Sequence, residues 1–187
     1  MSETSSEIGE LSEMENILQS IGMVSPVTKF SAGRSYHQQL ARQLADLLSS
    51  QGRLQRMGGM ITLTDLYSIY NRARGTELVS PDDLLQAASL MEHLHLGMRL
   101  RRFASGVIMI QADSLNEASL CQQLVDLSKS DPEFQIHGIF ATDLARKLCI
   151  SLLVAKEQLL LAEVKGMLCR DDSITGLSFF PNLFSTF

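Results

Sequence analysis

The sequence predicts an α+β fold, mainly helical with small β-hairpins, built as two tandem domains behind a helical arm. One order of helical and strand-like patterns occurs twice along the chain. A short motif also recurs, because Ile61-Thr62-Leu63-Thr64-Asp65-Leu66 aligns with Ile139-Phe140-Ala141-Thr142-Asp143-Leu144. The 187 residues, 45% of them hydrophobic, are enough for two cores. We therefore expect an arm and connector over residues 1–34, a first domain over 35–112 and a second over 113–187.

The arm is predicted to be an acidic amphipathic helix over residues 7–21, which Gly22 is placed to end. Its apolar positions, at three- and four-residue spacings, are Ile8, Leu11, Leu18 and Ile21. Residues 1–30 contain Lys29 as their single cation and the glutamates Glu3, Glu7, Glu10, Glu13 and Glu15. Because an anionic leaflet would repel this charge, we expect the arm to contact a protein partner rather than a membrane.

The first domain is expected to open with a helix after Ser35, a residue type favoured at N-caps. The apolar face of this helix comprises Leu40, Ala41, Leu44, Leu47 and Leu48. Residues 60–63 are apolar and prone to β-structure. Thr62 or Thr64 then caps a second helix that ends at Gly75.

Ser80-Pro81-Asp82-Asp83 is a strong start signal for a third helix. Serine is favoured at the N-cap, proline at the first helical position, and acids stabilise the positive end of the helix dipole. Two strand-like runs follow, residues 98–103 and 107–111, joined by a turn at 104–106. A helix, a strand, two helices and a hairpin in this order are typical of a winged-helix domain.

The same order returns in the second domain. Ser114-Leu115-Asn116-Glu117 matches a capping box that opens a helix, and Asp131-Pro132 is expected to break it. Ser151 is expected to cap the third helix. The strand, the two helices and the hairpin strands are expected at residues 138–140, 141–148, 152–165, 167–170 and 177–180.

No pattern in the sequence indicates catalysis, a metal or a cofactor, so we expect a non-enzymatic protein with no cofactor. His93 and His95 could place two imidazoles on one side of an extended segment, but a polar boundary between helix and wing accounts for them more simply. Cys121, Cys149 and Cys169 lack CxxC spacing, which favours buried core thiols in a reducing cytosol.

Winged helices often bind DNA, so a DNA-binding transcription regulator is the alternative function. The third helix of the first domain, residues 80–94, contains no Lys or Arg. The isoelectric point of about 5.3 also argues against a nucleic-acid partner. The basic cluster on the first wing is Arg99, Arg101 and Arg102. The third helix of the second domain is more apolar than one buried face requires, so its second face is covered within the fold or meets another chain.

Four segments closely resemble one known family, the GLUE-domain subunits of the ESCRT-II complex. The segments are IGMVSPVTKFSAG, ITLTDLYSIYNRARGTELVSPDDLLQA, SLLVAKEQLLLAE and LCRDDSITGLSFFPNLF. The resemblance implies a fold of two tandem winged helices, in agreement with the order of elements above. It also implies a non-catalytic subunit that sorts ubiquitinated membrane proteins into the multivesicular body pathway.

The partners that the resemblance implies are a related tandem winged-helix subunit and a small winged-helix subunit, with ESCRT-III contacted indirectly. The family's GLUE domain, which binds phosphoinositide and ubiquitin, has no counterpart in these 187 residues. Membrane and ubiquitin contact is therefore expected through that domain only. The expected location is cytoplasmic, with peripheral recruitment to endosomes.

The resemblance also implies a docking site for the small subunit, which we place on the second winged helix by position along the chain. The candidate residues are Leu168, Asp171, Asp172, Phe179, Phe180 and Leu183. The two acids offer partners for a basic side chain. Strand alternation could instead divide Phe179 and Phe180 between core and surface, and both possibilities stay open here.

Overall fold

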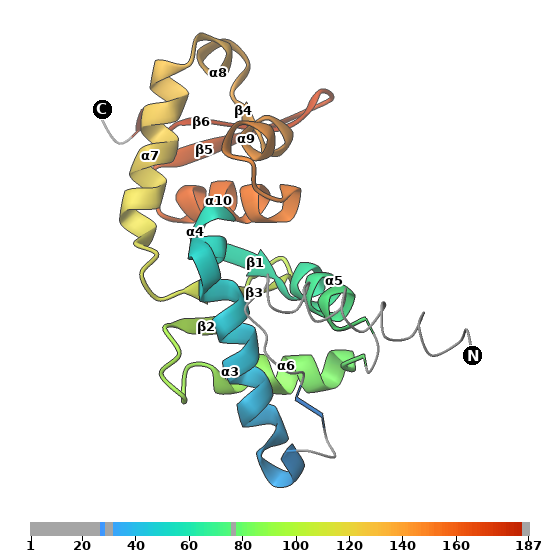
Figure 1. Cartoon of the computed structure of the whole chain (residues 1–187). Coiled ribbons are helices and arrows are strands. Elements are labelled where there is room, and N and C mark those ends of the chain that lie inside the picture. Colours follow the sequence, from blue (N-terminus) through green and yellow to red (C-terminus); the bar gives the residue numbers. More distant parts are fainter. Residues whose placement is uncertain (1–26, 29–31, 76–77, 185–187) are drawn as a thin grey trace, which may run out of the picture. The chain divides into compact units, whose positions relative to one another are not determined.

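The computed structural model describes residues 27–28, 32–75 and 78–184, which fold into two compact units (Figure 1). The first unit comprises the chain up to Arg56 together with Met60–Asp113. The second comprises Met57–Gly59 and the chain from Ser114 onward. The helix predicted over residues 7–21 lies outside the described residues. Among the described residues, no helix is both long enough and apolar enough to cross a bilayer.

The first unit contains three long helices and a three-stranded sheet. The three long helices are α3 (Tyr36–Ser49), α5 (Leu63–Arg74) and α6 (Pro81–Leu90). The strands are β1 (Met60–Thr62), β2 (Met98–Arg102) and β3 (Ile108–Ala112). Short helical turns complete the unit: η1 (Gly33–Ser35), η2 (Ser50–Gly52) and α4 (Arg53–Arg56). This is the predicted winged-helix order.

Caps fix where the helices of the first unit begin and end. Of the two threonines proposed as caps, Thr62 performs the role, because its Oγ1 accepts a hydrogen bond from the Asp65 N–H at 3.0 Å. Gly75 ends α5 with φ of 70°. The expected cap at Ser35 is wrong, since the Ser35 hydroxyl donates instead to the carbonyl of Ala32 at 2.8 Å.

The sheet of the first unit has the order β1-β3-β2, with both pairs antiparallel. Ile110 in the central strand lies opposite Ile61 and Leu100. Its side chain is fully buried, as are those of Leu40 and Leu44 from α3. The core therefore lies between the sheet and the helices. This placement agrees with the spacing of the apolar residues, which repeat about every 3.6 residues in a helix and every 2 residues in a strand.

The second unit repeats this plan. Its helices are α7 (Glu117–Ser130), α8 (Pro132–His137), α9 (Ala141–Leu148) and α10 (Leu152–Val164). Its strands are β4 (Ile139–Phe140), β5 (Leu168–Ser173) and β6 (Gly176–Pro181), in the sheet order β4-β6-β5.

Two local expectations for the second unit are wrong. The N-cap of α7 is Asn116 and not Ser114, because Asn116 Oδ1 accepts hydrogen bonds from the N–H groups of Ala118 and Ser119. Asp131-Pro132 was expected only to end α7, but it also begins the short helix α8. Asp131 Oδ1 accepts from the N–H of Glu133, and proline is well suited to the first position of α8.

The three cysteines differ in exposure. Cys121 is buried, Cys169 is intermediate and Cys149 is exposed. Burial, together with the nearby Glu117 carboxylate, raises the pKa of the Cys121 thiol. The expectation of three buried core thiols therefore holds for Cys121 alone.

Candidate partner-binding site

The β5–β6 hairpin carries five of the six residues predicted to bind a partner. A turn of two residues connects its strands, because Ser173 pairs with Gly176. The register places Leu168 opposite Pro181, and Asp171 opposite Ser178. Successive side chains of a strand leave opposite faces of a sheet, so the hairpin divides the predicted residues between two faces.

Leu168 and Phe179 lie on the face of the hairpin that belongs to the core. Each side chain is 1% exposed. Phe179 in the central strand lies opposite Ile139 of β4, which is fully buried. Alternation thus separates Phe179 from Phe180, the second of the two possibilities left open by the sequence. These two residues support the hairpin from within and do not present side chains to a partner.

Phe180 lies on the opposite face, half-buried against Gly138. A Cβ atom built at Gly138 would lie 2.8 Å from Cε2 and 2.9 Å from Cζ of Phe180. Gly138 also has φ of 73° and ψ of 179°, a conformation that is essentially restricted to glycine. A glycine at this position therefore lets the Phe180 ring lie close to the backbone just before β4.

The two acids of the hairpin are both exposed. Asp171 shares the face of Phe180, and alternation directs Asp172 to the other face. The neighbouring Arg170 is engaged by a bidentate ion pair, because its Nε and Nη2 lie 2.5 and 2.6 Å from the Glu163 carboxylate oxygens. Hydrogen bonding and the charge of Glu163 raise the pKa of Arg170. Arg170 and Glu163 thus connect the hairpin to the end of α10.

Leu183 follows β6, with 59% of its surface exposed, and Phe184 beside it is 78% exposed. Asn182 holds this segment in place. Its Nδ2 donates to the Gly166 carbonyl at 2.7 Å, and its Oδ1 accepts from the Phe184 N–H at 3.0 Å. Two exposed apolar side chains are therefore held beside the hairpin. The sequence prediction did not include Phe184 or the positioning role of Asn182.

A second exposed apolar group lies where α9 meets α10. Leu148, Leu152 and Leu153 are 41%, 51% and 43% exposed. The rest of α10 is largely buried, including Val154 and Leu159. The fold therefore covers most of this helix, and its beginning is exposed; contact of that exposed part with another chain stays a prediction.

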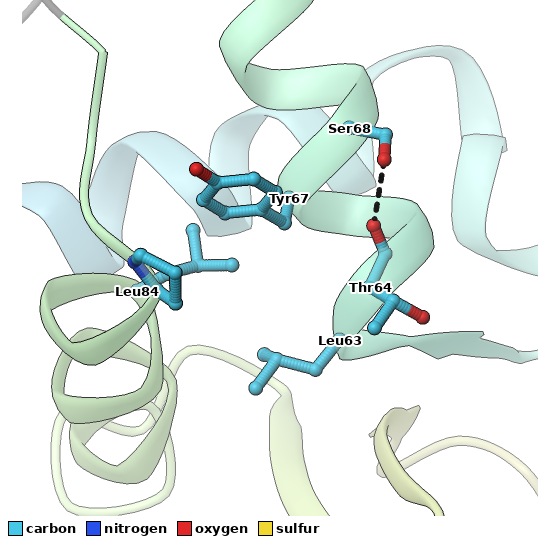
Figure 2. A pocket seen from close by; sticks show the side chains of 6 residues that line it. Leu63, Thr64, Tyr67, Ser68 and Leu84 are labelled. Carbon is cyan, nitrogen blue, oxygen red and sulfur yellow. Dashed lines mark hydrogen bonds between the residues drawn. The ribbon is translucent and has the colours of Figure 1, made fainter.

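Within the first unit, α5 and α6 enclose a hollow of about 310 Å³. Figure 2 shows Leu63, Thr64, Tyr67 and Ser68 on α5 and Leu84 on α6 around it. None of these residues was among the predicted site residues. Their spacing along α5 is the ordinary helical one, so the sequence pattern does not distinguish them from core positions.

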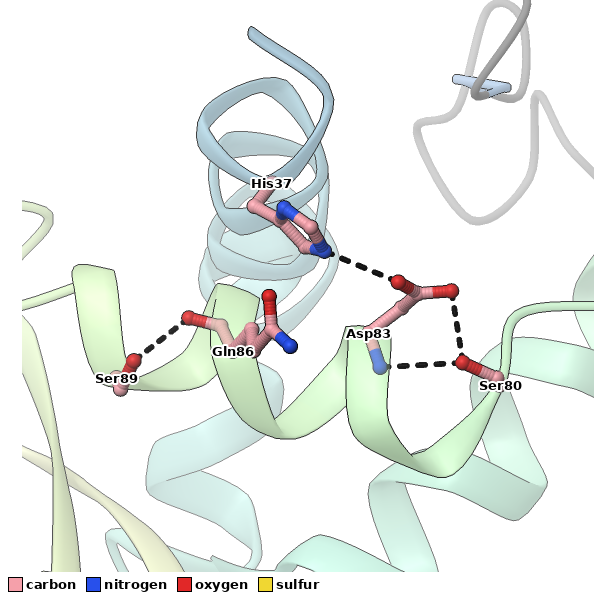
Figure 3. Close-up of polar contacts among 5 residues, drawn as sticks. All are labelled: His37, Ser80, Asp83, Gln86 and Ser89. Atoms are coloured by element: carbon pink, nitrogen blue, oxygen red, sulfur yellow. Dashed lines mark hydrogen bonds and ion pairs between the residues drawn. The ribbon is translucent and has the colours of Figure 1, made fainter. Parts of the chain in front are cut away.

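His37 and Asp83 connect α3 to the beginning of α6 (Figure 3). His37 Nε2 lies 3.0 Å from Asp83 Oδ1. The other carboxylate oxygen of Asp83 accepts a hydrogen bond from Ser80 Oγ at 2.7 Å, and Ser80 Oγ accepts one from the Asp83 N–H at 3.2 Å. Ser80 therefore caps α6, and the contact between Asp83 and His37 holds the beginning of α6 against α3. Elsewhere along the described ranges, no cluster of three or more His, Cys, Asp or Glu residues could hold a metal.

Two of the three basic residues of the first wing, Arg99 and Arg101, have partners within the fold. Arg101 Nη1 donates to Gln111 Oε1 at 2.8 Å, and its guanidinium lies 4.7 Å from the centre of the Phe103 ring. Arg99 lies 3.7 Å from Asp113. With a third helix that contains no Lys or Arg, this arrangement gives no support to the DNA-binding alternative.

The family model described as "EAP30/Vps36 family" matches residues 2–172. The chain belongs to the EAP30/Vps36 family. Its curated relatives include proteins from two vertebrates that are both named vacuolar protein-sorting-associated protein 36 (Vps36). The Danio rerio protein is 45% identical over 183 residues, 94% of this chain and 46% of the relative. The Homo sapiens protein is 42% identical over 185 residues, 95% of this chain and 46% of the relative.

The chain spans about half the length of these curated Vps36 relatives. The family resemblance inferred from the four sequence segments is confirmed. A solved structure described as "Structure of the ESCRT-II endosomal trafficking complex" aligns with a TM-score of 0.57. It covers 81% of this chain and 93% of its own, at 24% identity. This likeness confirms the predicted fold class, a mainly helical α+β fold.

Proposed function

We propose that this chain is a non-catalytic structural subunit of an ESCRT-II complex, which sorts ubiquitinated membrane proteins into multivesicular bodies. The observation that carries the proposal is the family match over residues 2–172, together with 42–45% identity to Vps36 proteins along almost the whole chain. The partners are a related tandem winged-helix subunit and the small winged-helix subunit, and through them, indirectly, ESCRT-III.

The distribution of exposed apolar side chains supports a role in assembly. Eight of the nine large hydrophobic residues that the described chain exposes belong to the second unit: Ile136, Leu148, Leu152, Leu153, Val164, Ile174, Leu183 and Phe184. Scattered exposed leucines are ordinary, but exposed apolar side chains grouped beside one hairpin, as Leu183 and Phe184 are, are a feature of protein–protein contact sites.

The small subunit docks, in this proposal, on the β5–β6 hairpin and the segment that follows it. Phe180 and Leu183 provide apolar contact area. Asp171 and Asp172 accept hydrogen bonds from a basic side chain of the partner, which are stronger than neutral hydrogen bonds because the acceptor is ionised. Leu168 and Phe179 keep the hairpin in place from the core side.

The proposed location is the cytoplasm, with peripheral recruitment to endosomes. Membrane and ubiquitin contact belongs to the GLUE domain of longer family members and is not assigned to the residues of this chain. The polar side chains of Ser80, Asp83 and His37 have structural partners. A catalytic role is therefore not part of the proposal.

Co-expression tests the proposal. A tagged form of the chain is produced alone and together with the other two ESCRT-II subunits of the same organism. We expect the isolated chain to be poorly soluble or aggregated, and the co-expressed chain to retain both partners through affinity purification and gel filtration. A stable, monodisperse monomer that retains neither subunit would contradict the proposal.

A further inference from the structure

Each of the two wings carries a serine at its tip, three residues after an arginine. Ser105 follows Arg102 in the turn between β2 and β3, and Ser173 follows Arg170 at the end of β5. Nowhere else in the 187 residues does a Lys or Arg precede a Ser or Thr by three positions. Basophilic protein kinases select a serine by an arginine at this spacing, because the guanidinium pairs with carboxylates of the kinase. The two wing tips are therefore the candidate sites for such a kinase.

The tip of the first wing offers its serine to a second protein. Ser105 and its two neighbours in the turn are exposed, and the strand ladder ends at Arg102. Beyond that point, the Phe103 N–H donates to the Val107 carbonyl at 2.9 Å, and the Gly106 N–H donates to the Phe103 carbonyl at 3.0 Å. The Val107 N–H also donates to Ser105 Oγ, at a long 3.4 Å. A short exposed turn of this kind opens locally at little cost, which lets a kinase groove accept the serine.

The arginine of the first wing is available to a kinase. Arg102 is exposed, and within the part of the chain that the structure describes its guanidinium has no hydrogen-bonding or ionic partner. Arg99 on the same strand differs, because it lies 3.7 Å from Asp113. The strands β2 and β3 and their turn contain no Asp or Glu, so this wing has no carboxylate of its own to engage Arg102. Pairing with a kinase therefore breaks no existing contact of this guanidinium.

The second wing has the same spacing without the same availability. Arg170 Nε and Nη2 lie 2.5 and 2.6 Å from the carboxylate oxygens of Glu163. Asp171 and Asp172 stand between this arginine and Ser173. An acidic kinase groove would repel these two carboxylates and would have to compete with Glu163 for the guanidinium. The tip of the second wing is therefore a poor substrate, although Ser173 is exposed.

We propose that Ser105 is a phosphorylation site for a basophilic protein kinase, which selects it through Arg102. In the transfer, Ser105 Oγ forms a bond to the γ-phosphorus of MgATP, the bond from that phosphorus to the β–γ bridging oxygen breaks, and ADP leaves. The hydroxyl proton passes to the catalytic aspartate of the kinase. The product carries a charge of about −1.5 to −2 at pH 7, and the exposed Arg102 can donate hydrogen bonds to its oxygens. The proposal does not depend on the proposed ESCRT-II function.

Phosphorylation of the full chain in vitro tests the proposal. The chain is incubated with MgATP and active calcium/calmodulin-dependent protein kinase II, which selects an arginine three residues before its serine, and mass spectrometry locates the phosphate. We expect phosphate at Ser105 and none at Ser173. Ser105→Ala should abolish the main incorporation, whereas Ser173→Ala, the matched control at the other wing tip, should leave it unchanged. Incorporation elsewhere in preference to Ser105, or none at all, would overturn the proposal.

Substitution of single arginines in the first wing tests how the serine is selected. Arg102→Gln should slow phosphorylation of Ser105 by about tenfold or more, because charge-assisted hydrogen bonds to the kinase are lost. Arg99→Gln removes the same charge from the same strand, further from the serine, and should leave the rate close to that of the unsubstituted chain. Circular dichroism of each variant confirms that the two winged helices are folded. Equal rates in the two variants would overturn the proposal.

Discussion

Phe179 and Phe180 are consecutive in β6, yet they lie on opposite faces of the sheet in the second unit. Phe179 is 1% exposed and lies opposite Ile139, whereas Phe180 is half-buried over Gly138. The hairpin therefore uses one aromatic ring to fill the core and presents the next at the surface. This division determines which substitutions should unfold the protein and which should only weaken a contact with a partner.

Truncation of the two rings should have unequal effects on stability. Phe179→Ala removes a fully buried ring and should lower the free energy of unfolding of the second unit by about 3–5 kcal/mol. Phe180→Ala removes a ring that is partly in water and should cost about 1 kcal/mol, because less apolar area is lost. Urea denaturation followed by circular dichroism measures both. Equal losses would contradict the assignment of the rings to different faces.

Gly138 should be intolerant of even one added methyl group. Gly138→Ala places Cβ 2.8 Å from the Phe180 ring, and φ of 73° with ψ of 179° adds a backbone penalty of about 1–3 kcal/mol. Gly138→Ala in a Phe180→Ala background is the matched control, because it keeps the backbone penalty and removes the ring. Thermal unfolding should show a larger fall in Tm for Gly138→Ala in the native background than in the Phe180→Ala background. Identical falls in the two backgrounds would indicate that the ring contact contributes nothing.

The Asp131 carboxylate should titrate at unusually low pH. Lys147 Nζ donates a hydrogen bond to its Oδ2, which lowers the pKa of Asp131 from the ordinary 3.8. A lowered pKa in the folded state means that the charged form contributes stability above the unfolded pKa, and that this contribution is lost as pH falls through the folded value. Carbon-detected NMR titration should find a midpoint below 3.8 that rises in Lys147→Met. The same midpoint in both proteins would rule out Lys147 as the cause.

The exposed acids of the hairpin should matter for binding and not for folding. Asp171→Lys with Asp172→Lys should reduce affinity for the small winged-helix subunit by at least about tenfold, since charge-assisted contacts are replaced by repulsion. Asp126→Lys, at an exposed position of α7, is the control and should bind normally. Calorimetric titration measures the affinities. An unchanged affinity of the double variant would refute the placement of the docking site on this hairpin.

The sequence predicted the elements whose signals are local. Ser80 and Ser151 accept hydrogen bonds from residues three positions later, as cap motifs require. The capping box at Ser114 failed because Asn116, two residues further along, competes for the same free N–H groups and is at least as good a cap. The α8 helix was missed because Asp131-Pro132 serves both as the end of one helix and as the beginning of the next.

The surface of the candidate site was harder to predict, because burial depends on pairing that no local pattern fixes. Leu168 and Phe180 are both apolar residues of the same hairpin, and only the register assigns the first to the core. The role of Asn182 depends on the carbonyl of Gly166, sixteen residues away in the chain. The hollow beside Tyr67 likewise forms only when α5 and α6 pack together.

The most direct test of the central claim, membership in an ESCRT-II assembly, is the mass of the complex that this chain forms. The chain is co-expressed with the other two subunits, purified through its own tag, and measured by native mass spectrometry. We expect one assembly whose mass contains this 20.7 kDa chain and both partners in a fixed ratio. A spectrum that shows only the free chain, under conditions in which the partners assemble with each other, would contradict the account.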